Sequence, residues 1–287
     1  MSDPAQSDPR NAIYNDLHSK QLSSEERQNE ISSRMILTIL FRYFKPLSVL
    51  DVGCELGTWL KIASEMDVPE IYGIDGPWLD ISQLRIPAPM AEKRDLETPF
   101  DLGRRFDLAI CLEVAEHLFE KSAAEFVGTL TRHAPVVLFS AAIPGQGGHH
   151  HVNERFLPYW AELFRHRRYR PLDIIRSEIW DYPEVHWWLR QNIVLFVHED
   201  MIGANDKFRE AFARPRGPLS LVHPEVYSRF VDSSNGLLRI IGQGGTFEIT
   251  PQPNGTLQIT RLKGPAASVT ADIQANPLAP DSKGIGW

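Results

Sequence analysis

Ser48-Val-Leu-Asp-Val-Gly-Cys-Glu-Leu-Gly-Thr-Trp59 is the stretch that decides the fold of this 287-residue chain. Its apolar first half predicts a buried strand, and Thr58–Met66 predicts a helix. Gly53 and Gly57 allow a sharp turn between the two. In open α/β sheets, ligands bind beyond the carboxyl ends of the strands, where a glycine-rich turn lets the backbone approach and a helix N-terminus offers free N–H groups. The turn is therefore expected to hold a ligand.

The residues of this turn also limit the kind of ligand. The spacing Gly-x-x-x-Gly is not the Gly-x-Gly-x-x-Gly of the dinucleotide fingerprint. Glu55 lies in the middle of the turn, where a carboxylate repels a pyrophosphate, so a nucleotide ligand without phosphate is favoured. Ile71–Asp75 predicts a second strand that ends in an acid, the placement that binds both ribose hydroxyls.

Together, the glycine turn and Asp75 resemble motif I and the acidic post-I position of class I S-adenosylmethionine-dependent methyltransferases. The resemblance covers residues 46 to about 199, although this chain has Glu55 where the family usually has glycine or a small residue. It implies S-adenosyl-L-methionine as cofactor and a Rossmann-like, doubly wound α/β sheet of seven strands with the last strand antiparallel. The cofactor-binding residues that it implies are Asp51, Gly53, Gly57, Trp59, Asp75, Gly76, Asp95, Leu96 and Glu113.

Two further residues have open interpretations. Met90–Leu96 predicts a third strand, and Asp95 resembles the family position where an acid accepts the adenine amino group. An aspartate before a turn is also a common cap. Trp78, just after the ribose-binding acid, stacks on adenine or fills a gap between loop and sheet.

Phe106–Glu113 predicts the fourth strand, followed at Val114–Leu118 by a helix that runs to about His133. This stretch resembles motif IV of methyltransferases with the sequence Glu-Val-x-Glu-His-Leu, in which Glu113 and its neighbours line the cleft below the methyl group. Residues 136–143 are almost uniformly apolar, as expected of a central parallel strand covered on both faces.

Pro144–Glu154 is the most unusual loop of the chain, with three glycines followed by His149, His150 and His151. Histidine titrates near neutral pH and can take the proton of an attacking hydroxyl. One of the three is the predicted catalytic base. The alternative is that they cap neighbouring backbone or pack against tryptophans.

The chain divides into a polar segment with a helix at 1–45, the cofactor-binding domain at 46–199 and an appendage at 200–263. A helix from about 22 to 44 has an apolar face that packs on the sheet or covers the cofactor mouth. The appendage is expected to be a small β element for homo-oligomer contact or substrate coverage. Residues 264–287, rich in Ala, Pro, Gly and Asp, are expected to lack stable order. The appended strands are expected at 237–241, 246–250 and 256–260, with a hairpin at Asn254-Gly255.

Composition narrows the class of partners. A hydrophobic content of 43% allows one substantial core, and the formal charge is −7. No basic block is long enough to track phosphates, so nucleic acid is disfavoured. The N-terminus has no leader pattern and no apolar run approaches about 18 residues, so no membrane association is expected. Cys54 and Cys111 indicate buried thiols in a reducing compartment, and we expect a cytoplasmic protein with a small-molecule substrate.

Three functions are consistent with these features. The first is O-methylation of a hydroxyl on a carbohydrate or secondary metabolite, with a histidine base. The second adds a divalent ion, because Glu113, Glu116, His117 and a loop histidine resemble the metal site of small-RNA 3′-end 2′-O-methyltransferases, and these N/O ligands accept Mg, Mn or Zn. The third is a non-catalytic S-adenosylmethionine-binding scaffold, with which Glu55 is most compatible.

Overall fold

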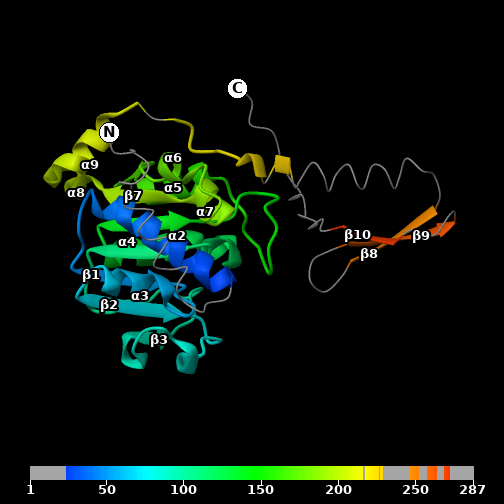
Figure 1. Ribbon diagram of the computed structural model, residues 1–287, viewed down its shortest axis with the longest axis horizontal. Coiled ribbons are helices and arrows are strands. Elements are labelled where there is room, and N and C mark those ends of the chain that lie inside the picture. The colour runs from blue at the N-terminus through cyan, green and yellow to red at the C-terminus, as the bar shows by residue number, and fades with distance from the viewer. Residues whose placement is uncertain are drawn as a thin grey trace, which may run out of the picture. The chain divides into compact units, whose positions relative to one another are not determined.

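The computed structural model describes residues 24–215, 217–225 and 227–228, together with the backbone of strands at 246–251, 257–263 and 268–271 (Figure 1). The chain forms two compact units. One comprises residues 1–143 and 152–223, and the other comprises residues 144–151 and 224–287.

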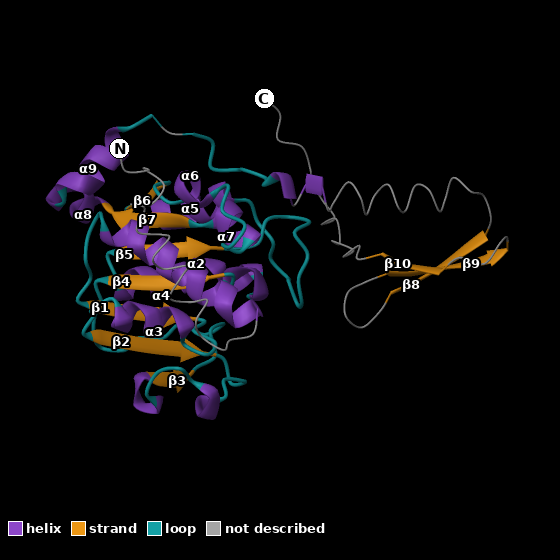
Figure 2. Ribbon diagram, viewed as in Figure 1, coloured by secondary structure: helices purple, strands orange, loops and turns teal. Residues whose placement is uncertain are grey.

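The first unit is built on a seven-stranded sheet of order β3-β2-β1-β4-β5-β7-β6 (Figure 2). Strands β1 to β5 run parallel, whereas β7 is antiparallel to both β5 and β6. The predicted α/β sheet with an antiparallel last strand is therefore confirmed. The strands are β1 Ser48–Val52, β2 Glu70–Asp75, β3 Ala91–Lys93, β4 Leu108–Leu112, β5 Val136–Ser140, β6 Tyr169–Leu172 and β7 Val194–His198.

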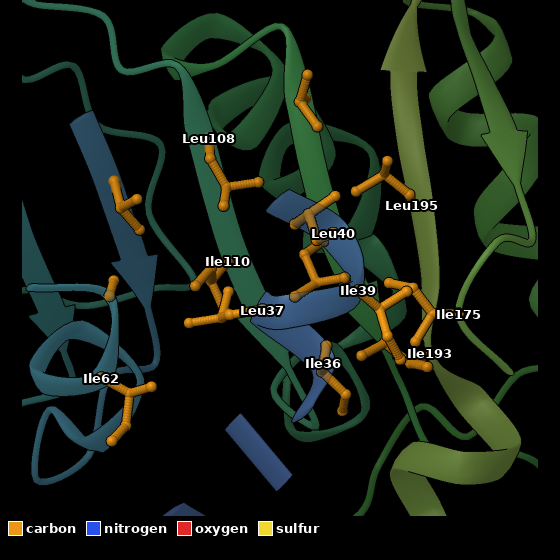
Figure 3. Close-up of a cluster of buried hydrophobic side chains, with 14 of the residues drawn as sticks. Ile36, Leu37, Ile39, Leu40, Ile62, Leu108, Ile110, Ile175, Ile193 and Leu195 are labelled. Carbon is orange, nitrogen blue, oxygen red and sulfur yellow. The ribbon is translucent and has the colours of Figure 1, made fainter. Parts of the chain in front are cut away.

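Successive strand residues point to opposite faces of the sheet, so the buried side chains form two cores. In β4, Leu108 and Ile110 belong to one hydrophobic cluster, and Ala109 and Cys111 belong to the other. Figure 3 shows the first cluster, in which strand side chains meet residues of an N-terminal helix. This division explains why the central strands are apolar on both faces.

Helices cover both faces of this sheet. Helix α2 (Ser24–Phe41) and helix α3 (Thr58–Glu65) contribute to the first cluster, and α4 (Glu120–His133) and α5 (Leu157–Arg165) contribute to the second (Figure 1). Ile36, Leu37 and Leu40 of α2 have no exposed surface. The expected N-terminal helix is thus part of the core, as the packing interpretation predicts. The remaining helices are α6 Arg176–Ile179, α7 Trp187–Asn192, α8 Glu199–Ala204, α9 Asp206–Ala213 and the short 3₁₀ turns η2 Ile81–Gln83, η3 Ala88–Met90 and η4 Ala115–His117.

Ion pairs and a buried histidine hold α2 in place. The carboxylate of Glu30, which is fully buried, accepts from Lys61 Nζ of α3 at 2.5 Å. At the other side of the helix, His186 Nε2 lies 2.7 Å from Asn29 Oδ1, and the His186 ring stacks on Trp188 at 4.2 Å. Burial lowers the pKa of His186 to about 4, so this histidine is neutral at physiological pH.

The helix predicted from Val114 to His133 is interrupted, and that prediction is wrong. The turn η4 ends at His117, and α4 begins only at Glu120. Leu118 and Phe119 have extended backbones, and the Phe119 N–H donates to Glu97 Oε1 at 2.7 Å. The break satisfies a backbone donor at the start of α4 by a side chain from another segment.

The appendage also begins later than predicted. Helices α8 and α9 and residues up to 223 belong to the first unit, so the boundary at residue 200 is wrong. Phe208 of α9 is fully buried, and its ring is stacked with that of Tyr43 at a centroid distance of 6.3 Å. This packing explains why α9 belongs to the first unit. Among the described residues, no helix is long and apolar enough to cross a lipid bilayer.

The described part of the second unit includes a three-stranded antiparallel sheet of order β10-β9-β8. Its strands are β8 Thr246–Pro251, β9 Leu257–Lys263 and β10 Ser268–Ala271. The antiparallel pairing of β8 with β9 confirms two of the predicted strands. The turn expected at Asn254-Gly255 and the strand expected at 237–241 lie outside the described residues. Strand β10 is a correction, since it lies in a segment predicted to lack order. Its Val and Thr favour strands, and β9 offers it an edge for hydrogen bonding.

Candidate functional site

The turn after β1 has the backbone conformation that its glycines permit. Gly53 and Gly57 have φ of 86° and 77°, and Glu55 between them has φ of 50°. A Cβ at Gly53 would lie 2.2 Å from Val114 Cγ2, so glycine is required there for close packing against the segment that follows β4. Positive φ at Glu55 is uncommon for a residue with a side chain, and such strain concentrates at binding sites.

Asp75, the last residue of β2, holds this turn by its carboxylate. Its Oδ2 accepts from the Glu55 N–H at 2.6 Å, and its Oδ1 accepts from the Gly76 N–H at 2.6 Å. The motif I turn and the acidic end of β2 are thus joined by hydrogen bonds. Of the residues predicted to bind cofactor, the structure brings Gly53, Asp75 and Gly76 together at one edge of the sheet.

Asp51 completes an acidic cluster at the same edge. It is 2% exposed, and its Oδ2 is buried with no hydrogen-bond partner within the described part of the chain. Burial, then the charges of Asp75 and Glu55, raise the pKa of Asp51 well above its ordinary value. The cluster suits a ligand that is cationic and lacks phosphate. S-adenosylmethionine carries a sulfonium and an ammonium and no phosphate, so these residues fit it.

Other residues predicted to bind the cofactor contact the hydrophobic cores or a neighbouring turn. Trp59 lies half-buried in α3 and packs against the first core cluster, and Leu96 is buried in the second. The exposed Asp95 accepts from the Glu97 N–H at 3.0 Å and from Thr98 Oγ1 at 3.1 Å, so its carboxylate caps a turn. Trp78 is 78% exposed, and a Cβ on Gly76 would lie 2.2 Å from its ring. The adenine role of Asp95 stays a prediction.

Glu113 follows β4 and is fixed by several contacts. Its φ of 53° is in the left-handed region, and its N–H donates to the carbonyl oxygen and to Oγ of Ser140, both at 3.1 Å. Its carboxylate accepts from Asn192 Nδ2 at 3.1 and 3.3 Å. The end of β4 is therefore held by β5 on one side and by the end of α7 on the other.

Glu116 forms a carboxyl pair with Glu113. Glu116 is fully buried, and its Oε1 accepts from the Ala142 N–H at 3.1 Å. Burial, then the charge of Glu113, raise the pKa of Glu116 well above its ordinary value. Each of the two carboxyl groups therefore disfavours the ionisation of the other.

The histidine loop is anchored where it rejoins the first unit. The N–H groups of Val152 and Asn153 donate to the Glu116 carbonyl oxygen at 2.9 and 3.0 Å. Within the loop, the His149 and His150 rings meet edge to face with centroids 4.1 Å apart. Both of these side chains are exposed, and His151 is half-buried.

Asn192 and Gln191 are the site residues that sequence reasoning missed. Both are nearly fully buried, and Gln191 Nε2 donates to Asn192 Oδ1 at 2.9 Å. A buried amide pair just before a strand is the signal in the sequence, but nothing local to it identifies Glu113 as the partner.

Comparison with known proteins shows the family of the chain. A sequence model of the family described as "Methyltransferase domain" matches residues 24–182, which is more than half of the chain. No curated protein matches the chain in sequence.

Solved structures align with more than half of the chain at low identity. Magnesium protoporphyrin IX methyltransferase of Synechocystis, with S-adenosylmethionine bound, is 13% identical with a TM-score of 0.44, over 67% of this chain and 92% of its own. The sugar N-methyltransferase KedS8 of Streptoalloteichus is 15% identical with a TM-score of 0.44, over 66% and 92%. The methyltransferase domain of the bacterial protein CtHen1-CN is 18% identical with a TM-score of 0.44, over 58% and 97%.

These TM-scores are below 0.5, so the family of the chain is shown by the family match together with the sequence motifs. The matched residues contain the strand-turn-helix at Ser48–Trp59, the acid at the end of β2 and the glutamate pair after β4. The chain therefore belongs to the methyltransferase domain family and is a class I S-adenosylmethionine-dependent methyltransferase.

Proposed function

We propose that this enzyme methylates a hydroxyl group of a small molecule, such as a carbohydrate or secondary metabolite, with a loop histidine as base. The observation that carries the proposal is the pair of hydrogen bonds from Val152 and Asn153 to the Glu116 carbonyl oxygen. One peptide bond joins His151 to Val152, so their Cα atoms are about 3.8 Å apart. His151 thus directly precedes, along the chain, two residues that are hydrogen-bonded to the turn after β4.

A hydroxyl must lose its proton as it attacks a methyl group, and a histidine near neutral pKa suits this role. When bound, S-adenosylmethionine supplies a methyl group activated by the sulfonium charge. The chain's own residues then position the reactants. Asp75 binds the ribose, and Asp51 with its acidic neighbours binds the cationic end of the cofactor. Glu113 lines the cleft below the methyl group. Most of the rate enhancement in such a transfer comes from alignment of the reacting atoms.

The cofactor assignment of Asp75 is tested by calorimetry. We expect Asp75→Ala to weaken S-adenosylmethionine and its demethylated product by about 10- to 100-fold, because a charged hydrogen-bond partner contributes ~1.5–3 kcal/mol. Asp80→Ala is the matched control, since Asp80 is exposed and caps η2 by accepting from the Ser82 N–H. Equal affinities for wild type and Asp75→Ala would contradict the ribose role.

The base is tested by single His→Gln changes at 149, 150 and 151, with activity screened on a panel of alcohols. One of the three is expected to lose about 10²–10⁴-fold in turnover while cofactor affinity is unchanged, because a base acts on the rate. His166→Gln is the control, since His166 is an exposed histidine paired with Glu162 at 3.1 Å. If no alcohol is methylated and amines are, the hydroxyl proposal fails.

The carboxyl pair supports a second candidate, a divalent-metal-dependent O-methyltransferase. Glu113 and Glu116 raise each other's cost of ionisation, and a cation between them would be stabilised by two carboxylates. Glu116, His117 and Glu113 would hold such an ion together with a loop histidine, and the ion would supply charge stabilisation for the substrate oxygen.

Glu116→Gln separates the two candidates. Glutamine keeps an acceptor for the Ala142 N–H and nearly the same shape, but it removes the carboxylate that a metal ion would need. Turnover that survives Glu116→Gln and is insensitive to chelator supports the metal-free mechanism. Turnover that chelator abolishes, that a divalent ion restores and that Glu116→Gln eliminates supports the metal mechanism instead.

A further inference from the structure

A surface basin with a volume of about 660 Å³ lies at the end of the sheet opposite to the cofactor turn. Its walls come from the loop before β4, the end of α4, the starts of β5 and β6, and the end of β7 with α8. In Figure 2, α8 lies at the end of the sheet where the parallel strands begin, whereas Gly53 follows the carboxyl end of β1. The basin is therefore separate from the methyl-transfer site.

Three arginines line the basin. Arg105, Arg132 and Arg167 come from three different segments and all reach solvent. Within the described residues, none of the three has a carboxylate within 4.0 Å. The whole chain carries a formal charge of −7, so this concentration of positive charge does not reflect a generally basic protein.

Neighbouring groups fix the direction of each arginine. Arg105 lies near the Tyr169 hydroxyl, on whose pKa its charge acts, and this hydroxyl donates to the Ala134 carbonyl oxygen at 2.7 Å. Arg132 Nη1 donates to the Phe100 carbonyl oxygen at 2.9 Å.

The third arginine depends on a glycine for its position. Arg167 lies against α4 at Gly128, where an added Cβ would be 2.6 Å from Arg167 Nη2. Alanine favours a helix interior more than glycine does, so glycine at this position has a packing reason.

The basin also contains one acid and one histidine. Asp200 pairs with Arg168 Nη2 at 2.9 Å, and Arg168 itself is not part of the wall. His198 Nδ1 accepts from the Asp200 N–H at 3.3 Å. The charge of Asp200 is thus opposed by an additional arginine, and the basin stays net positive.

We propose that this basin binds a small phosphorylated metabolite. Guanidinium groups present several donors in a fixed plane and match phosphate oxygens in geometry and charge. The volume is in the range of about 300–1,000 Å³ that is typical of small-ligand sites. An extended nucleic acid is disfavoured because the three arginines converge on one basin and do not follow a track.

Inorganic pyrophosphate is the probe, measured by calorimetry and by thermal unfolding of the full chain. Wild type is expected to bind it and to unfold at a higher temperature in its presence. Arg105→Ala and Arg167→Ala are each expected to weaken binding by about tenfold or more, because each removes a charged hydrogen-bond donor. Arg104→Ala is the matched control, since Arg104 is the next residue in the loop but pairs with Glu70 at 2.6 Å.

Gly128→Ala keeps every charge and tests position alone. The added methyl displaces the Arg167 guanidinium, so pyrophosphate binding is expected to weaken while S-adenosylmethionine binding stays at the wild-type level. Cofactor binding in all four variants also reports that they are folded. Absence of pyrophosphate binding by wild type overturns the proposal, as does equal binding by wild type, Arg105→Ala and Arg167→Ala. Binding of a single-stranded oligonucleotide without binding of pyrophosphate overturns it in favour of a polymer surface.

Discussion

The side-chain amide of Asn192 donates to both carboxylate oxygens of Glu113, at 3.1 and 3.3 Å, although the two residues are 79 positions apart. The amide is held in turn by Gln191, whose Oε1 accepts from the His223 N–H at 2.8 Å. Because each donor in this series has a defined acceptor, the Glu113 carboxylate is held in one orientation. The end of the first unit is thereby connected to the carboxyl end of β4, where we propose that the methyl group is transferred.

Asn192→Leu is expected to lower turnover by about 10- to 100-fold, since hydrogen bonds to charged groups contribute ~1.5–3 kcal/mol. Cofactor affinity should change little, because Asn192 acts by orienting Glu113. Steady-state kinetics and calorimetry measure the two effects. The control is Asn205→Ala, which removes the N-cap of α9 and should cost ~0.5–2 kcal/mol of stability without loss of turnover. Equal turnover of Asn192→Leu and wild type would show that the orientation of Glu113 is not needed.

Asp51→Asn is expected to stabilise the ligand-free protein and to weaken S-adenosylmethionine. The pKa of Asp51 is raised in the folded state above its ordinary value of 3.8, so the unfolded chain ionises first. The contribution of Asp51 to stability is therefore full below pH 3.8 and is lost as pH rises through its folded-state pKa.

Thermal unfolding at a series of pH values measures this effect. The wild type should lose stability over that rise in pH, and Asp51→Asn should lose less. If Asp51→Asn leaves both stability and cofactor affinity unchanged, the Asp51 carboxylate does not pair with the cationic end of S-adenosylmethionine.

Gly53→Ala and Gly103→Ala form a matched pair at positive φ. Both positions have left-handed backbones, at 86° and 65°. A Cβ at Gly53 meets Val114 Cγ2 at 2.2 Å, whereas a Cβ at Gly103 has nothing within 4 Å. We expect Gly103→Ala to cost about 1 kcal/mol from backbone strain, and Gly53→Ala to cost a further ~1–3 kcal/mol from overpacking. Denaturant unfolding gives both values, and equal costs would show that Val114 moves aside freely.

Shortening the chain should show which residues after α9 the first unit needs. A protein that ends after Pro224 keeps the contacts of the first unit and is expected to bind S-adenosylmethionine like the full chain. A protein that ends after Arg214 loses the Leu219 carbonyl oxygen that accepts from the buried Arg176 at 3.0 Å. It also loses the His223 N–H that holds Gln191. The second truncation should therefore unfold at a lower temperature, since unpaired buried polar groups cost about 1–3 kcal/mol each. Loss of binding in the longer protein would show that the second unit is needed for the site.

The sequence alone determined the sheet and the place of the cofactor turn. Residues 48–59 encode a strand, a turn and a helix through hydrophobic pattern and glycine, and these are local effects that need no partner. Asp75 could be placed at the end of a strand because its distance along the chain from the first glycine is set by one helix and one strand. The extent of the helix after Val114 was misjudged, because the break at Leu118 depends on Glu97 from another segment.

Only the tertiary structure decided which distant side chains meet. Asn192 reaches Glu113 because β7, which follows α7, pairs with β5, the neighbour of β4 in the sheet. The hydrophobic pattern of a strand does not reveal which strand lies next to it. The pKa of Glu116 is raised by its burial and by the charge of Glu113, and both are properties of the packed site. Likewise, Arg105, Arg132 and Arg167 form no basic run in the sequence. They become one positive surface only because the starts of several strands and the end of α4 converge at one end of the sheet.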